Sequence, residues 1–108
     1  MTWPCAVAGW ELIDRLHEYY DVTPSDQLHK LYEECGEVAA AYIGLTGTNP
    51  RKGVTHTLDD VVDELLDVIV TAMVALNHFS VDPEAEFLRA MSDRGKYKQR
   101  LSVREEGS

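Results

Sequence analysis

Residues 30–44 read KLYEECGEVAAAYIG, and residues 59–76 read DDVVDELLDVIVTAMVAL. In both stretches apolar residues recur at three- and four-residue steps, which is typical of amphipathic helices. Acidic residues stand beside the apolar stripe in each stretch, and the alternating pattern of a β-strand is almost absent. These two stretches therefore predict two long helices, each with carboxylates along the edge of its buried face.

Local helix signals extend this assignment to the rest of the chain. Thr23 precedes Pro24, Thr57 precedes a leucine and two aspartates, and Asp82 precedes Pro83. Each pattern combines a residue favoured as an N-cap with residues favoured in the first helical turn. We therefore expect helices at about residues 8–20, 24–45, 58–79 and 83–97 or 83–100, with a loop at residues 46–56.

Four helices with mostly short connections are typical of an all-α four-helix antiparallel bundle. We expect residues 1–101 to form this single domain and residues 102–108 to form a flexible C-terminal tail. In the helix expected at residues 58–79, Val70 and Val74 lie opposite Leu65, Ile69 and Leu76. Because a helix that is apolar on all sides must be buried on all sides, we predict a homo-dimer or homo-tetramer that shares this helix.

Composition excludes several classes of protein. The chain has 108 residues, 44% of them apolar, and a net charge of −9, so it has the composition of one globular domain and would repel polymeric nucleic acid and anionic membranes. Its two cysteines form no Cys-x-x-Cys pair, which argues against a structural zinc site. Since neither a secretion signal nor a membrane-spanning segment is visible, we expect a cytoplasmic protein.

The acidic residues carry the chemistry. Glu34 and Glu37 are three residues apart, as are Glu64 and Asp67, so each pair projects from adjacent turns on one side of its helix. If the two helices pack antiparallel, the four carboxylates converge, and a hard divalent cation would relieve their repulsion. Oxygen ligands without thiolate or imidazole favour Mg²⁺, with Mn²⁺ as a possible substitute. The alternative is a solvated acidic face.

The two motifs, Glu33-Glu34-x-x-Glu37 and Glu64-x-x-Asp67 with 26 residues between them, resemble the EExxE and ExxD motifs of the all-α nucleoside triphosphate pyrophosphohydrolases. This superfamily includes the MazG-like proteins and the dimeric dUTPases. The resemblance covers about residues 28–79, roughly half of the chain. It implies a MazG-like fold and Mg²⁺-dependent hydrolysis of a nucleoside or deoxynucleoside triphosphate between its α and β phosphates. The products would be a monophosphate and pyrophosphate, as in the cleaning of nucleotide pools.

The resemblance also implies that Glu34, Glu37, Glu64 and Asp67 are metal ligands. Glu33, on the same helix but turned further toward solvent, is the catalytic candidate: it would suit orienting or deprotonating the attacking water, or holding an additional ion, and the alternative is an exposed surface acid. Further candidates come from the residues themselves. Lys30 lies one turn before Glu34 and could contact a phosphate or simply pair with Glu34.

Candidates for the rest of the substrate lie elsewhere in the chain. Arg51 and Lys52 in the loop could close over a triphosphate, and the basic residues after residue 88 could contact phosphate or pair with a neighbouring subunit. Asn77 could hydrogen-bond a base, and the aromatic or histidine candidates for base contact are Trp3, Trp10, Tyr19, Tyr20, Tyr42 and His78. A different class of function remains open: a non-catalytic acidic helical module that binds a nucleotide or a basic protein.

Overall fold

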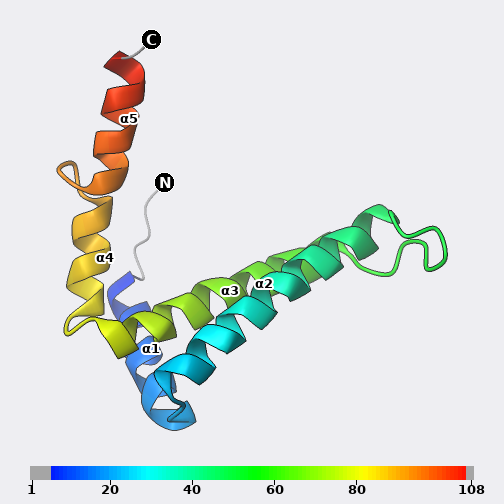
Figure 1. The fold of residues 1–108 in the computed structure, drawn as a ribbon, viewed down its shortest axis with the longest axis horizontal. Coiled ribbons are helices and arrows are strands. Elements are labelled where there is room, and N and C mark those ends of the chain that lie inside the picture. Colours follow the sequence, from blue (N-terminus) through cyan, green and yellow to red (C-terminus); the bar gives the residue numbers. More distant parts are fainter. Residues whose placement is uncertain (1–5, 107–108) are drawn as a thin grey trace.

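The computed structural model describes residues 6–106, and every regular element in this range is a helix (Figure 1). The helices are α1 (Ala6–Tyr20), α2 (Pro24–Thr46), α3 (Leu58–Phe79), α4 (Pro83–Met91) and α5 (Lys96–Glu106). The prediction of an all-α protein is therefore confirmed, and the first three helices lie within two residues of their expected bounds.

The predicted caps begin the helices. The Thr23 hydroxyl accepts a hydrogen bond from the Asp26 backbone N–H at 3.1 Å, which caps α2. At α3 the Thr57 hydroxyl accepts from the Asp60 N–H at 3.3 Å, while the Asp60 carboxylate accepts from the Thr57 N–H at 2.8 Å. This reciprocal pair is a capping box, and it fixes where the chain turns from the loop into α3.

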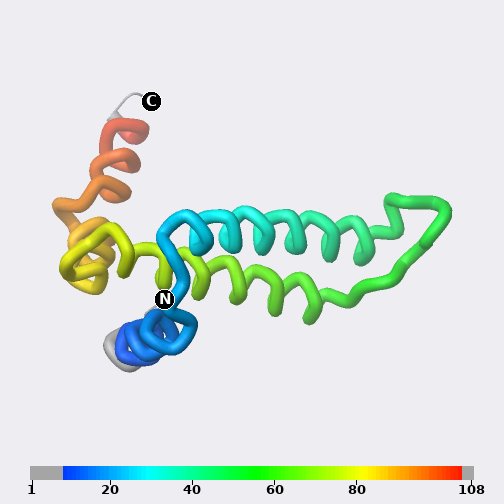
Figure 2. The backbone as a smooth tube through the Cα atoms, turned by 60° about the horizontal axis from the view of Figure 1, so that its bottom comes forward, coloured from blue at the N-terminus to red at the C-terminus, as the bar shows by residue number. Residues whose placement is uncertain are grey.

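Helices α2 and α3 form an antiparallel hairpin, the longest feature of the molecule (Figure 2). Near its open end the Gln27 amide donates a hydrogen bond to the Thr71 carbonyl at 3.3 Å. At the loop end the backbone N–H groups of Thr55 and His56 donate to the Gly44 carbonyl at 2.9 and 3.3 Å. Bonds at both ends therefore set the register of the two helices.

The core of the monomer is small and lies where α1 crosses the open end of the hairpin. It consists of Trp10, Ile13 and Val74, with Leu16 and Met73 packed against it. The Trp10 ring also contacts the Phe87 ring of α4, with 6.0 Å between centroids. Trp10 therefore joins three helices.

The predicted extent of the last helix is wrong, because the helix is interrupted between Met91 and Lys96. Ser92 is extended and its hydroxyl bonds the Arg89 carbonyl at 2.8 Å, which ends α4. Gly95 packs so closely on the carbonyls of Arg89 and Ala90 that a Cβ would not fit there. Helix α5 then continues through Glu106, so residues 102–106, expected in a flexible tail, are helical.

The predicted antiparallel bundle is present only as its central pair, α2 and α3. Among the described residues, α4 contacts the end of α3, and α5 continues away from the hairpin (Figure 1). The radius of gyration is 17.2 Å, compared with about 13 Å for a compact chain of this length. The single chain therefore leaves much apolar surface uncovered, including Leu65, Leu66 and Ile69 of α3.

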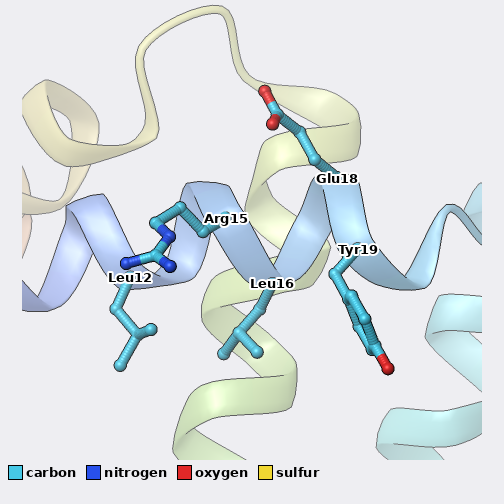
Figure 3. A pocket seen from close by; sticks show the side chains of 5 residues that line it. All are labelled: Leu12, Arg15, Leu16, Glu18 and Tyr19. Carbon is cyan, nitrogen blue, oxygen red and sulfur yellow. The ribbon is translucent and has the colours of Figure 1, made fainter.

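Helix α1 also presents an apolar stripe that is only partly covered. Leu12, Leu16 and Tyr19 extend to the same side of the helix, one turn apart, while Arg15 and Glu18 point elsewhere (Figure 3). Tyr19 is 80% exposed and Leu12 is 53% exposed. Leu16 is partly buried against the core, so the uncovered part of the stripe consists of Leu12 and Tyr19.

No single helix among residues 6–106 meets the length and hydropathy criteria for crossing a membrane, and only α3 together with the segment Pro83–Glu105, bent by 116°, meets them as a pair.

The buried Gly44 gives a test of the hairpin. A Cβ at Gly44 would overlap the His56 ring and lie 2.6 Å from the Thr55 hydroxyl, so Gly44→Ala should lower the free energy of unfolding by about 1–3 kcal/mol. Gly36 on the same helix has nothing within 4 Å of a Cβ position, and Gly36→Ala should be neutral or raise stability by up to about 1 kcal/mol. Urea denaturation of both variants measures the difference, and equal stability would contradict the loop packing.

Candidate metal centre

Three carboxylates meet at the middle of the hairpin. Glu34 and Glu37 come from adjacent turns of α2, and Glu64 comes from α3. One carboxylate oxygen from each residue lies within 4.8 Å of the other two. Below, these three residues are called the glutamate trio.

The register of the α2–α3 hairpin explains why the three carboxylates lie close together. Glu34 follows Gln27 by seven residues on α2, and Glu64 precedes Thr71 by seven residues on α3. Seven residues are about two helical turns, so the hydrogen bond between Gln27 and Thr71 places Glu34 opposite Glu64. Glu37 is one turn further along α2 and completes the trio.

Burial makes this cluster different from a solvated acidic face. Glu34 is only 6% exposed, although it is a charged residue, and Glu64 is partly buried. The Oε2 atoms of both residues are buried and have no hydrogen-bond partner among the described residues. Buried carboxylate oxygens without donors are costly, so a cation bound at these oxygens would stabilise the arrangement.

The trio also perturbs its most exposed member. A hydrogen bond with the Glu34 carboxyl group, together with the charges of Glu34 and Glu64, raises the pKa of Glu37 above its usual range. Without a cation, Glu37 therefore retains a proton more readily than a separate glutamate would. A bound divalent cation would displace this proton.

Among the described residues, Lys30 is the basic partner of the trio. Its ammonium lies 3.0 Å from Oε1 of Glu34 and 4.0 Å from Oε2 of Glu33. The Glu34 side chain is 8% exposed, whereas that of Lys30 is 55% exposed. The hydrogen bond to Glu34 raises the pKa of Lys30, so this residue remains charged.

The chemistry and size of the trio fit a small hard cation. All three ligand atoms are carboxylate oxygens, the type preferred by Mg²⁺ and Mn²⁺. Oxygens at about 2.1 Å from one Mg²⁺ lie at most about 4.2 Å apart, so small side-chain movements would bring the trio into coordination distance. Glu34, Glu37 and Glu64 are thus the residues that could hold the ion.

Asp67, the fourth predicted ligand, is exposed and outside the trio, but it lies one turn beyond Glu64. Together with Lys30 and Glu34 it lines a cleft of about 570 Å³. The cleft extends to the end of α1, where its lining includes Tyr20 and Val22 together with Asp26. Through Glu34, the trio therefore adjoins a cleft that is lined by both charged and apolar side chains.

The other predicted site residues lie outside the trio. Glu33 is exposed and faces solvent beside Lys30. Arg51 and Lys52 are exposed in the loop, and the end of α2 alone is about 14 Å beyond Glu37. Asn77 is about 15 Å along α3 from Asp67, and its amide donates to the Met73 carbonyl at 3.4 Å. This chain does not bring Arg51, Lys52 or Asn77 to the trio.

Among the candidates for base contact, Tyr20 lines the cleft, whereas Trp10 is buried in the core. His78 packs edge-on against His17, with 4.5 Å between ring centroids, and Trp3 lies outside the described residues. Sequence reasoning missed Gln27, which is buried and lines the cleft. Its spacing of seven residues from Glu34 was the available signal, because that spacing places both on one helix face.

Replacing one member of the trio tests the charge crowding. In the absence of metal, Glu64→Gln should raise the free energy of unfolding at neutral pH by about 1 kcal/mol, since it removes one of three neighbouring negative charges. Because the pKa of Glu37 is higher in the folded than in the unfolded protein, protonation of Glu37 favours the folded state. This contribution to stability is complete below the pKa that Glu37 has in the unfolded protein, and it is lost as the pH rises through the pKa of Glu37 in the folded protein. Stability of the variant should therefore fall less over this pH range.

Added Mg²⁺ should stabilise the original protein and have little effect on Glu64→Gln, as measured by chemical denaturation with and without the ion. Asp63→Asn is the matched control, because it makes the same change of charge at the adjacent exposed position of α3. An equal response to Mg²⁺ in Glu64→Gln and the original protein would contradict a metal centre at the trio.

Comparison with known proteins identifies the family of this chain. Comparisons with curated proteins and with solved structures found no match. The sequence does match the family described as phosphoribosyl-ATP pyrophosphohydrolase over residues 11–96, which include α2, α3 and the whole trio. The chain therefore belongs to the phosphoribosyl-ATP pyrophosphohydrolase family, within the MazG-like superfamily of all-α nucleoside triphosphate pyrophosphohydrolases.

Proposed function

We propose that this protein is a Mg²⁺-dependent nucleotide pyrophosphohydrolase. It cleaves a nucleoside or deoxynucleoside triphosphate between the α and β phosphates and releases a monophosphate and pyrophosphate. The observation that carries this proposal is the glutamate trio, with two buried oxygens that have no donor among the described residues. Membership of a pyrophosphohydrolase family supports the reaction class.

The positions of the acidic residues suggest a separate role for each in the proposed reaction. Glu34, Glu37 and Glu64 would hold the ion, and Asp67, one turn further along α3, would be a further ligand. When bound, Mg²⁺ would neutralise negative charge on the phosphate oxygens and on the leaving pyrophosphate. Glu33, exposed on the solvent side, accepts a proton from the attacking water.

The cleft next to the trio is the proposed binding site for the rest of the nucleotide. Its acidic side chains Glu34 and Asp67 would face the metal-bound phosphates, and Lys30 would contact a phosphate oxygen. Its apolar side chains, among them Tyr20 and Val22, suit the flat apolar face of a base. Arg51, Lys52 and Asn77 would contact substrate only from another protomer or after movement of the chain.

The family name and the sequence favour different substrates. The family is described by its action on phosphoribosyl-ATP, whereas the motifs alone indicate nucleoside triphosphates in general. Both substrates carry a triphosphate, so the same metal centre serves either. We propose the general reaction, in the cytoplasm and in nucleotide-pool cleaning, and phosphoribosyl-ATP belongs in the substrate panel that tests it.

The test is release of pyrophosphate from a panel of canonical, damaged and phosphoribosylated nucleotides with Mg²⁺ or Mn²⁺. Glu37→Gln or Asp67→Asn should reduce turnover by at least about 100-fold, because each removes a charge from the metal centre, while the helical circular dichroism stays unchanged. Asp63→Asn should keep its activity. Absence of turnover with every nucleotide would instead favour the non-catalytic acidic module.

We further propose that the protein acts as a homo-dimer or homo-tetramer. The support is the extended shape and the exposed apolar residues of α3, among them Leu65, Leu66 and Ile69. Apolar faces of this size on a small chain are typical of protein–protein interfaces. A second copy packed on this face of the hairpin would complete the predicted bundle with helices of the same kind.

Sedimentation equilibrium tests the assembly. The original protein should have the mass of a dimer or tetramer, and Ile69→Asp should shift it toward monomer, because burying an unpaired aspartate at an interface is strongly unfavourable. Val103→Asp, at a position 70% exposed on α5, is the control and should leave the mass unchanged. A monomeric original protein would contradict the proposed assembly.

A further inference from the structure

Lys30 sits between the glutamate trio and the cleft. Its ammonium donates to Oε1 of Glu34 at 3.0 Å, and its side chain also lines the cleft with Asp67. We propose that Lys30 is a positioning residue that holds Glu34 in the metal-free protein, is displaced from it by the ion, and then binds a phosphate oxygen. The inference rests on the proposed function, because it needs the trio to bind a metal.

The unequal burial of Lys30 and Glu34 supports the role of Lys30 in holding Glu34 in the metal-free protein. Glu34 is 6% exposed, and its Oε2 has no hydrogen-bond partner among the described residues. Its other oxygen accepts the charged hydrogen bond from Lys30. Without this bond, a buried carboxylate would face Glu37 and Glu64 with no positive charge on it, so Lys30 holds Glu34 against repulsion.

The position of Lys30 supports its displacement by the ion and its contact with a phosphate oxygen. An ammonium within hydrogen-bond distance of Glu34 would lie close to any cation bound by the same carboxylate, and the two positive charges would repel. The Lys30 side chain is 55% exposed and has a flexible four-carbon stem, so it can turn away without moving α2. The cleft that it lines is the place where phosphates would follow the metal.

This role predicts that removing the Lys30 charge raises the affinity for Mn²⁺ and lowers the affinity for pyrophosphate. A salt bridge without a phosphate contact would not predict both effects. Lys30→Met keeps the apolar stem and removes the charge. The metal-free variant should be less stable, yet it should bind Mn²⁺ more tightly, by about fivefold, because no ammonium competes for Glu34. With Mn²⁺ bound, the same variant should bind pyrophosphate about tenfold more weakly, because a phosphate contact is lost.

The experiment is calorimetric titration of the intact protein with Mn²⁺ alone, followed by titration of the Mn²⁺-saturated protein with inorganic pyrophosphate. Lys30→Arg keeps the charge and should not gain affinity for Mn²⁺. Lys98→Met, on exposed α5, changes the net charge equally and should leave Mn²⁺ affinity unchanged, which separates a local effect from a general one.

Three results would overturn the inference, and the first of them would overturn the proposed function as well. If the original protein takes up no Mn²⁺ at the trio, the proposed function fails and the inference fails with it. If Mn²⁺ binds but Lys30→Met binds it equally or more weakly, only the inference is overturned, since Lys30 then does not compete with the ion. Tighter Mn²⁺ binding with unchanged pyrophosphate affinity would also overturn it, because the phosphate contact would be absent.

Discussion

The antiparallel register of α2 and α3 is the constraint on which the site depends. The hydrogen bond from Gln27 to Thr71 and the loop bonds to the Gly44 carbonyl hold the two helices at opposite ends. Between these points, Glu34 and Glu64 have to face each other, each seven residues from the Gln27–Thr71 contact. A shift by one residue would rotate one carboxylate by about 100° and separate the cluster. The fold therefore holds together charges that would otherwise move apart.

Two features limit the cost of this arrangement when no metal is bound. Lys30 supplies a positive charge to the buried Glu34, and the raised pKa of Glu37 allows a proton to remain in the trio. Neither feature satisfies the buried Oε2 atoms of Glu34 and Glu64. A divalent cation would satisfy both, which also explains how a protein with a net charge of −9 could bind a triphosphate.

Much of this was predictable because its causes are local. Thr23, Thr57 and Asp82 each cap a helix as expected, and the three-residue spacing of Glu34 and Glu37 placed them on one side of α2. The break between α4 and α5 was missed, because it depends on Ser92 and on the close approach of Gly95 to the end of α4, and a single glycine is a weak signal. Closure of the bundle was also not predictable from one chain's pattern, since periodicity shows which face is apolar but not which chain covers it. Arg51, Lys52 and Asn77 are candidates for substrate contact because of their chemical type, but their distance along the chain separates them from the trio.

The central claim is that the trio binds a divalent cation, and anomalous diffraction from crystals grown with Mn²⁺ tests it most directly. The account predicts one anomalous peak between α2 and α3, with carboxylate oxygens of Glu34, Glu37 and Glu64 at about 2.1–2.3 Å from it. Crystals without a peak at this position, in which the three carboxylates have turned apart toward water, would contradict the account.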